Sequence, residues 1–470
     1  LTACRRLQSS LKPHPLCARS SSSPGATAGM SEQNTPSSDQ ALYQAPPSVR
    51  GMTVLDREAF TQTVTVPALL VPTGLVNRAL KSLKKLTLQR PGVKRVVEEE
   101  GCGETHKLVL LDPRVSSLDA IAGTGLQDLG VASEIRHFAL RLTYDNLRSE
   151  EVLRAVLPDG HDVTSGFSRV GHIAHMNLRD HQLPYRNLIG QVIMDKNPGV
   201  TCVVNKTNSI DSTYRHFSME LLAGEDNMVA KVRENGLLYE FDFSRVYWNP
   251  RLSTEHERIV SQLRREDVVV DVFAGVGPFA VPAARRGCAV FANDLNPESF
   301  RWLQHNSRIN KVTDKVTAFN LDGRDFIRGP VRDLLPDLLR AKTSVHVVMN
   351  LPALAIDFLD SFRGLLAHEP GVGVACEGTL PRVHCYSFSK DDAPQRDVVR
   401  RAAASLGAEL DGVCSVHMVR NVAPNKEMLC VSFTLPKEVV FSDTHPSSGE
   451  KHTHFLRFTL YHTIFIYKAL

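Results

Sequence analysis

Asp271-Val-Phe-Ala-Gly275-Val-Gly277-Pro-Phe-Ala280 is the stretch that decides the fold of this 470-residue chain. It begins inside an apolar run, residues 268–273, and leads into a helical pattern. Glycines let the backbone turn tightly and approach a ligand where a side chain would collide. The stretch therefore predicts a buried strand, a glycine turn and a helix, with a nucleotide-like ligand at the carboxyl end of the strand.

The pattern that follows predicts an α/β domain. Apolar runs of strand length at 268–273, 289–292, 316–319 and 345–349 alternate with helical stretches. Continuous apolar runs are typical of strands buried on both faces, as in a parallel sheet covered by helices on each side. We therefore expect a doubly wound, mostly parallel sheet that ends near residue 436.

Polar residues at successive strand ends distinguish between two ligands. The glycine pattern alone also fits a dinucleotide dehydrogenase. Asp271 argues against it, because a carboxylate beside the turn attracts an ammonium group rather than a pyrophosphate. Asp294 is placed for ribose hydroxyls and Asp322 for an adenine amino group, while Asn350 offers an amide. We favour S-adenosylmethionine over a nicotinamide cofactor, because its cationic end, ribose and adenine suit all four residues.

The rest of the chain predicts two smaller α+β domains ahead of this one. Residues 75–88 have the spacing of a basic amphipathic helix, and a hairpin-like pair of segments lies at 228–234 and 237–243. The expected division is a presequence-like and disordered segment (1–50), an N-terminal module (51–133), a middle domain (134–248), the doubly wound domain (249–436) and a tail of unknown structure (437–470).

The first 30 residues have the composition of a mitochondrial presequence. They contain basic residues and many serines, and no acid occurs before Glu32. A disordered tail would have a similar composition. Met30 could serve as an internal start, so we expect the protein in the mitochondrial matrix, the nucleus and the cytoplasm.

The overall composition narrows the class of protein. Hydrophobic residues make up 42% and charged residues 23%, which is typical of globular proteins, and no apolar run is long enough to span a bilayer. The net charge of +4 requires any polyanionic partner to be met by local basic patches. The nine cysteines form no C-x-x-C pair, and His172 with His175 lack further ligands, so we expect neither a metal site nor membrane insertion.

A second constellation lies ahead of the doubly wound domain. It consists of Tyr247-Trp-Asn-Pro-Arg-Leu-Ser-Thr-Glu255-His256, Arg215 in Tyr-Arg-His-Phe, the sequence Leu-Ala-Gly-Glu225, and Asn350-Leu-Pro. With these motifs in this order, the chain resembles the archaeal and eukaryotic tRNA guanine-37 N1-methyltransferases over about residues 48–436. The resemblance implies a class I (Rossmann-like) methyltransferase domain, a middle domain, and an N-terminal module that touches tRNA.

The resemblance also implies roles for single residues. Glu255 matches the general base on guanine N1, Arg215 matches an arginine at O6, and Tyr247 lines the site. Asn350 is suited to orient the base by hydrogen bonding. Leu354 stands where the family has a basic residue, which puts one peripheral contact in doubt. The expected S-adenosylmethionine contacts are His256, Asp271, Gly275, Gly277, Asp294, Leu295, Asp322, Gly323 and Asn350.

Methylation of guanine N1 itself requires a base and a positively charged group, the two roles that the resemblance implies. Guanine N1 carries a proton at neutral pH, so a positioned carboxylate must remove it, and a fixed guanidinium stabilises the charge that develops on O6. A guanine in a folded loop must be extruded, and Tyr247 and Trp248 are suited to stack on it.

We therefore expect a monomeric enzyme whose substrate is tRNA with guanine at position 37, bound in part by basic residues at 81–85. Two alternatives stay open. One is a methyltransferase for another RNA position or a protein amide, and the other is an inactive tRNA-binding homologue.

Overall fold

The computed structural model describes residues 44–98, 105–126, 134–158, 166–210, 217–369, 371–372 and 379–443. These residues form two compact units. One contains Val64–Thr87 and Glu98–Phe138, and the other contains Gln44–Thr63, Leu88–Val97 and the chain from Ala139 onward. The expected presequence at 1–30 and the apolar part of the tail after 443 lie outside the described residues. The five-part division of the chain stays a prediction.

The structure describes short segments just outside two of the expected boundaries, at 44–50 and 437–440. Residues 44–50 are ordered, because Val49 in the 3₁₀ helix η1 (Pro47–Val49) is fully buried and the Arg50 guanidinium donates to the Leu157 carbonyl at 2.6 Å. At the other end, helix α12 (Lys437–Val440) buries Val439 and Val440 in the core of the C-terminal α/β domain. A few apolar side chains are enough to fix both segments, although their surroundings in the sequence are polar.

The smaller unit contains the basic helix, in a shorter form than expected. Helix α2 runs over Val76–Ser82, and strand β1 (Gln62–Pro72) pairs antiparallel with β3 (His106–Leu110). The helix ends early because the chain turns after Leu83 and brings Thr87 into a bridge with Leu111. Leu83 is buried while Lys81, Lys84 and Lys85 are exposed, which confirms the amphipathic pattern.

Ahead of the C-terminal sheet in the sequence, the larger unit contains a small four-stranded sheet. Its strand order is β5-β6-β7-β8, and its helices share a core with the sheet and with Val49. The middle pair, β6 and β7, is parallel and the outer pairs are antiparallel. The elements are α3 (Ser149–Val156), β5 (Ser168–Val170), β6 (Ile173–Met176), α4 (Arg186–Lys196), β7 (Cys202–Ile210) and β8 (Phe217–Gly224). Strand β4 (Ile135–Leu142) belongs instead to the sheet that contains β1 and β3.

The expected hairpin is confirmed. Strands β9 (Val229–Glu234) and β10 (Leu237–Asp242) pair antiparallel around Asn235 and Gly236. Both turn residues have positive φ, +47° and +79°, which is the conformation that Asn-Gly adopts in two-residue hairpin turns.

The C-terminal part is a seven-stranded sheet of order β13-β12-β11-β14-β15-β17-β16. The strands from β13 to β15 are parallel, and β16 and β17 form an antiparallel hairpin at one edge. The strand order reverses between β11 and β14, where ligands bind in open α/β sheets. The strands are β11 (Val268–Asp271), β12 (Ala289–Asn293), β13 (Val316–Phe319), β14 (Val345–Met349), β15 (Arg382–Ser389), β16 (Cys414–Ala423) and β17 (Lys426–Thr434).

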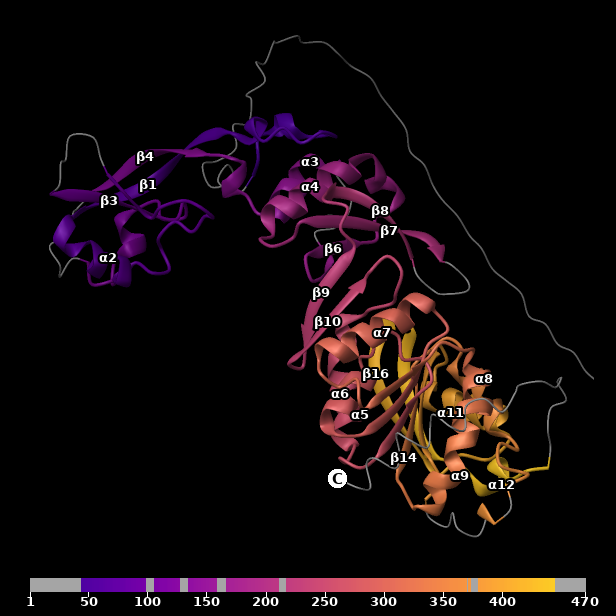
Figure 1. The fold of residues 1–470 in the computed structure, drawn as a ribbon. Coiled ribbons are helices and arrows are strands. Elements are labelled where there is room, and N and C mark those ends of the chain that lie inside the picture. Colours follow the sequence, from indigo (N-terminus) through magenta and orange to yellow (C-terminus); the bar gives the residue numbers. More distant parts are fainter. Residues whose placement is uncertain are drawn as a thin grey trace, which may run out of the picture. The chain divides into compact units, whose positions relative to one another are not determined.

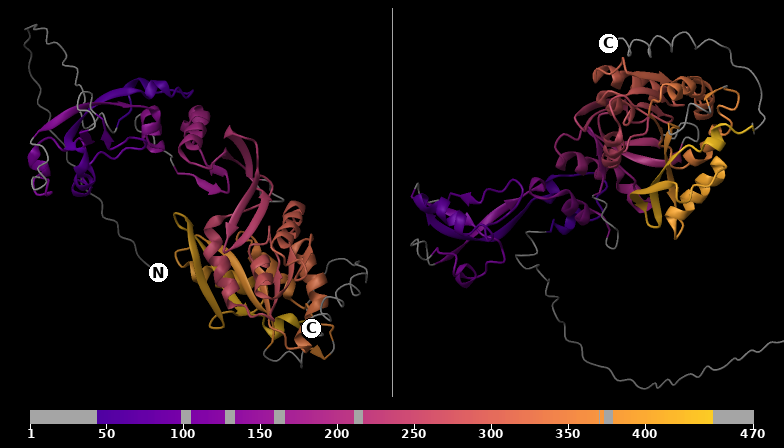
Figure 2. Two further views of the ribbon diagram at one scale, coloured as in Figure 1. Left: turned by 60° about the vertical axis from the view of Figure 1, so that its left-hand side comes forward. Right: turned by 90° about the horizontal axis from the view of Figure 1, so that it is seen from below.

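Helices cover both faces of this sheet, as the sequence predicts (Figures 1 and 2). One face carries α5 (Ser253–Gln262), α6 (Ala280–Arg286) and α7 (Pro297–Ile309). The opposite face carries α8 (Gly323–Phe326), α9 (Arg332–Arg340), α11 (Pro394–Leu406) and α12. None of the described helices is both long and apolar enough to cross a membrane.

Asn306 on α7 ties three elements together beneath the glycine turn. Its amide donates to the Val276 carbonyl at 3.0 Å and accepts the Glu240 backbone N–H at 2.9 Å, and the side chain is fully buried. Val276 belongs to the turn and Glu240 to β10, so one side chain fixes the turn against both the helix and the hairpin.

We expect Asn306→Leu to lower the free energy of unfolding by about 1–3 kcal/mol, because it leaves two backbone groups without a partner. Asn421→Leu on the exposed part of β16 is the matched control and should change stability by less than about 0.5 kcal/mol. Denaturant unfolding followed by circular dichroism measures both. Equal stability of the two variants would show that Asn306 does not hold the turn.

Candidate active site

The two glycines of the turn serve different needs. Gly275 has φ +56° and a Cβ built on it would meet no atom within 4 Å, so its outer side is open to a ligand. Gly277 has φ +100°, and a Cβ there would lie 2.8 Å from Val281 and 2.9 Å from Leu303. Gly277 therefore permits close packing of the helices, while Gly275 faces the space where a ligand approaches.

Two carboxylates lie on either side of this turn. Asp294 accepts the Gly275 backbone N–H at 2.8 Å and the Asn296 N–H at 3.0 Å, which fixes the turn to the end of β12. Asp271 is completely buried, and neither of its carboxylate oxygens has a hydrogen-bond partner. Burial, reinforced by the charge of Asp294, raises the pKa of Asp271 well above its ordinary value. An ammonium group at this place would supply both the donors and the opposite charge that Asp271 lacks.

Two aromatic side chains pack beside Gly323, one of the expected cofactor contacts. The Phe273 and Phe358 rings meet edge to face with centroids 5.0 Å apart, and a Cβ on Gly323 would lie 2.9 Å from Phe273. Leu295, another expected contact, is 45% exposed and therefore accessible to a ligand. Asp322 caps helix α8 by accepting the Arg324 N–H at 2.8 Å, so a structural role accounts for part of its placement.

Asn350 follows β14 and presents an unused acceptor. Its side-chain oxygen is buried without a hydrogen-bond partner, although the residue as a whole is partly exposed. The neighbouring Pro352 carbonyl is occupied, because it accepts the Phe388 N–H at 3.0 Å. The amide of Asn350, rather than that carbonyl, is therefore the group left for a ligand.

The motif ahead of the sheet separates its two aromatic residues. Tyr247 is 56% exposed and its hydroxyl accepts from the Asn249 amide at 3.2 Å. Trp248 is buried between Tyr239 and Phe241, with ring centroids 5.2 and 5.0 Å away. The expectation that Trp248 stacks on a base is wrong, because its ring is part of the core.

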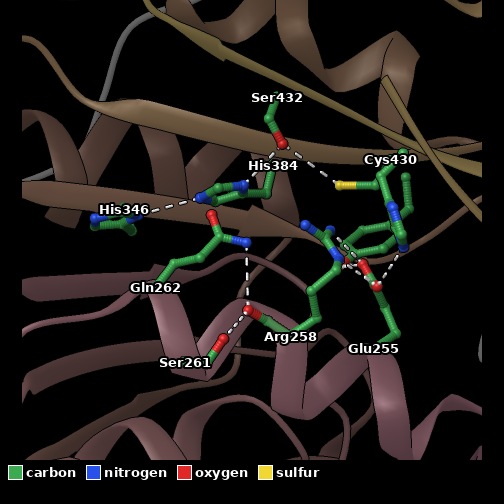
Figure 3. A network of polar contacts seen from close by, with 10 residues as sticks. Glu255, Arg258, Ser261, Gln262, His346, His384, Cys430 and Ser432 are labelled. Atoms are coloured by element: carbon green, nitrogen blue, oxygen red, sulfur yellow. Dashed lines mark hydrogen bonds and ion pairs between the residues drawn. The ribbon is translucent and has the colours of Figure 1, made fainter. Parts of the chain in front are cut away.

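Glu255 is buried in the first turn of α5 and is held by three donors. The Arg258 guanidinium donates to both carboxylate oxygens at 2.6 Å, and the Tyr386 hydroxyl donates to Oε1 at 2.6 Å. A fourth neighbour, His417, has its Nε2 3.4 Å from Oε2. Figure 3 shows Glu255 and Arg258 facing each other beside Cys430. A carboxylate accepts about four hydrogen bonds, so one position on Oε2 remains open.

Aromatic contacts join this carboxylate to the glycine turn. Phe279, which ends the turn sequence, lies edge to face on His256 at 4.7 Å and against Tyr386 at 5.9 Å between centroids. The His256 Nδ1 lies 2.6 Å from the Glu234 carboxylate, and both side chains are buried. His256 therefore packs on the turn and is fixed by the hairpin strand β9.

Sequence reasoning located only part of this site. Glu255 and His256 are brought to the turn as expected, whereas Arg215 lies outside the described residues. Arg258 was missed, although its spacing of three from Glu255 on a helix is a recognisable ion-pair signal. Tyr386 and His417 come from distant strands of the sheet, and nothing in the local sequence marks them.

Taken together, these groups fit a ligand with a cationic amino-acid end and an aromatic base. Asp271 has buried oxygens without partners, the open side of Gly275 lies beside Asp294, and Phe273 borders an apolar patch. A buried polar atom without a partner costs free energy in a folded protein unless a ligand satisfies it. S-adenosylmethionine meets all of these requirements.

Comparison with known families identifies two parts of the chain. Residues 230–402 match the TRM5/TYW2 methyltransferase domain, and residues 149–227 match the TYW2 N-terminal domain.

Curated relatives match almost the whole chain. The chain is 68% identical over 418 residues to a tRNA (guanine(37)-N(1))-methyltransferase of Danio rerio, covering 87% of this chain and 86% of that protein. It is 55% identical over 423 residues to a protein of the same name in Homo sapiens, covering 88% and 82%.

Two solved structures share the fold. Trm5b from Pyrococcus abyssi has a TM-score of 0.53 at 24% identity, covering 78% of this chain and 99% of that one. A complex of aTrm5 with tRNALeu has a TM-score of 0.54 at 20% identity, covering 79% and 100%.

The buried charge of Asp271 leads to a stability prediction. The pKa of Asp271 is raised in the folded protein, so its ionisation opposes folding. This destabilisation is absent below the unfolded-state pKa and grows as the pH rises toward the folded-state pKa. Asp271→Asn should therefore stabilise the ligand-free protein at neutral pH by about 1–3 kcal/mol. The difference in the free energy of unfolding between variant and wild type should become smaller as the pH falls from about 7 to about 4.

Denaturant unfolding at several pH values measures this gap, with the exposed Asp325→Asn as the control. Titration calorimetry should show that Asp271→Asn also weakens S-adenosylmethionine binding while Asp325→Asn does not. An Asp271→Asn variant less stable than wild type at neutral pH would contradict the raised pKa and the lack of hydrogen-bond partners of Asp271.

Proposed function

This chain belongs to the tRNA (guanine(37)-N(1))-methyltransferases, and on that premise we propose how its residues transfer a methyl group from S-adenosylmethionine to N1 of guanine 37. The enzyme class follows from the family. The roles of single residues are inferred from their chemistry and surroundings.

Glu255 is the proposed general base. Guanine N1 is protonated at neutral pH and is a poor nucleophile, so its proton must leave as the methyl group arrives. The observation that carries this role is a buried carboxylate that keeps one open acceptor position and packs, through Tyr386 and Phe279, onto the glycine turn. Arg258 fixes the plane of the carboxylate with two hydrogen bonds, one to each oxygen.

Residues around the turn would hold the methyl donor. Asp271 would pair with the amino group, Asp294 would accept from the ribose, and Leu295 with Gly323 and Asp322 would border the adenine. When bound, S-adenosylmethionine supplies a methyl group on a positively charged sulfur. His256, Gly275 and Gly277 shape the wall of this pocket, since His256 is fixed by Glu234 and packs on Phe279.

Two further groups would act on the guanine. Arg215 would stabilise the negative charge that develops on O6, which raises the rate only if the contact is stronger in the transition state than in the ground state. Asn350 would orient the base edge through its unpartnered side-chain oxygen, which suits a guanine N–H donor. Because Asn350 follows β14 at the reversal of strand order, it borders the same crevice as the turn.

The target guanine must leave its stack in the anticodon loop to reach this pocket. The exposed ring of Tyr247 is the proposed stacking partner for it. Contacts with tRNA phosphates would come in part from the exposed lysines 81, 84 and 85 of the smaller unit.

We expect Glu255→Gln to lower the single-turnover rate of methyl transfer to guanine-37 tRNA by about 10²–10⁴-fold, because the amide cannot take the N1 proton. The affinity for S-adenosylmethionine should stay within about threefold, since Glu255 is not among the proposed cofactor contacts. Rapid quench with a radiolabelled methyl group measures the rate, and calorimetry measures the affinity.

The exposed neighbour Glu257→Gln on the same helix is the matched control and should transfer at the wild-type rate. A tRNA with adenine at position 37 should receive no methyl group from any of these proteins. Wild-type transfer by Glu255→Gln would exclude Glu255 as the base, and transfer to the adenine-37 tRNA would contradict the assigned acceptor.

A further inference from the structure

A base that takes a proton in each turnover must also lose it before the next. Methyl transfer to guanine N1 converts an N–H group into an N–CH₃ group, so one proton per turnover is left on Glu255 if the proposed function is correct. Glu255 is buried, so this proton needs a neighbouring group through which it reaches solvent.

Most of the neighbours of Glu255 are unsuited to this task. Arg258 is already protonated, since its hydrogen bonds to Glu255 raise its pKa further. Tyr386 already donates a hydrogen bond to Glu255 and is almost completely buried, and burial raises its pKa well above the ordinary value. Burial likewise raises the pKa of the Cys430 thiol beyond Tyr386 to about 11.

The polar chain that continues from Cys430 runs inward along the sheet (Figure 3). Cys430 contacts the Ser432 hydroxyl at 3.7 Å, Ser432 contacts His384 at 2.9 Å, and His384 contacts His346 at 3.1 Å. Burial lowers the pKa of His384 to about 3, so this imidazole stays neutral and resists an additional proton. This chain binds the strands to one another and offers no path for a charge.

His417 both lies beside Glu255 and is exposed to solvent, unlike these groups. Its Nε2 lies 3.4 Å from Glu255 Oε2, the oxygen with the open acceptor position, and its side chain is 46% exposed. It belongs to β16, the edge strand of the sheet. Imidazole is the side chain that exchanges protons with water most readily near neutral pH. We propose that His417 takes the proton from Glu255 after each methyl transfer and delivers it to solvent.

The transfer balances without any further reactant. The Glu255 Oε2–H bond breaks and its electron pair remains on the carboxylate, while the lone pair of neutral His417 Nε2 forms the new N–H bond. The imidazolium then gives a proton to water or buffer. Arg258 and Tyr386 favour this direction, because both donate hydrogen bonds to the ionised carboxylate that the step restores. Oε2 first takes the proton of guanine N1 and then gives it to His417. The two steps do not compete, because the methylated guanine has no N1 proton.

The test separates methyl transfer from proton release. A weakly buffered solution with a pH-indicator dye reports proton release in a stopped-flow single turnover with guanine-37 tRNA, and rapid quench reports methyl transfer in parallel. In the wild type the two rates should agree. In His417→Ala the methyl-transfer rate should stay within about twofold, proton release should lag by at least about tenfold, and added imidazole should remove the lag.

His305→Ala is the matched control, because His305 is also partly exposed and lies 2.8 Å from a carboxylate, that of Glu240. It should show no lag and no response to imidazole. Proton release that keeps pace with methyl transfer in His417→Ala would overturn the proposal. Methyl transfer that slows together with proton release would also overturn it, because His417 would then act on the substrate. A failure of Glu255 as the base would appear separately, as undiminished transfer by Glu255→Gln.

Discussion

The contact between the Glu255 carboxylate and its donors Arg258 and Tyr386 is the interaction on which the site depends. It joins helix α5, which lies outside the sheet, to strand β15 within it. A buried carboxylate is stable only when donors surround it, so this ion pair and hydroxyl make a charged group possible beside the pocket. Because Tyr386 also packs on Phe279, the same contact sets the distance between the proposed general base and the turn proposed to hold the methyl donor.

The site contains one carboxylate with hydrogen-bond donors, Glu255, and one without partners, Asp271. This difference matches the roles proposed for them. Glu255 has three donors and must keep its position while a proton arrives and leaves. Asp271 is buried with no partner, so the ligand-free protein is destabilised at the place proposed for the cationic end of the ligand. Ligand binding would recover this free energy, which makes Asp271 a source of affinity rather than of stability.

The sheet and its turn were predictable from sequence because their signals are local. Strand β14 matches the apolar run at 345–349 and is buried along its whole length, since strands buried on both faces are continuously apolar. The partly buried edge strand β13 also matches its run, at 316–319. The basic helix at 75–88 was predicted too long, because its end is set by a bridge between Thr87 and a distant strand. Trp248 was misjudged for a similar reason, since its burial depends on Tyr239 and Phe241 of the hairpin.

The polar surroundings of Glu255 were the least predictable part of the site. Tyr386 is separated from Glu255 by 131 residues, and only the topology of the sheet brings them together. Family resemblance identified Glu255 and His256, but it indicated neither the donors that hold the carboxylate nor His417 on the edge strand.

The most direct test is a structure of the protein with guanine-37 tRNA and S-adenosylhomocysteine. The account predicts that guanine N1 lies within about 3.2 Å of Glu255 Oε2 while Arg258 still donates to the same carboxylate. A guanine whose N1 faces a different side chain, with Glu255 enclosed by its present donors, would contradict it.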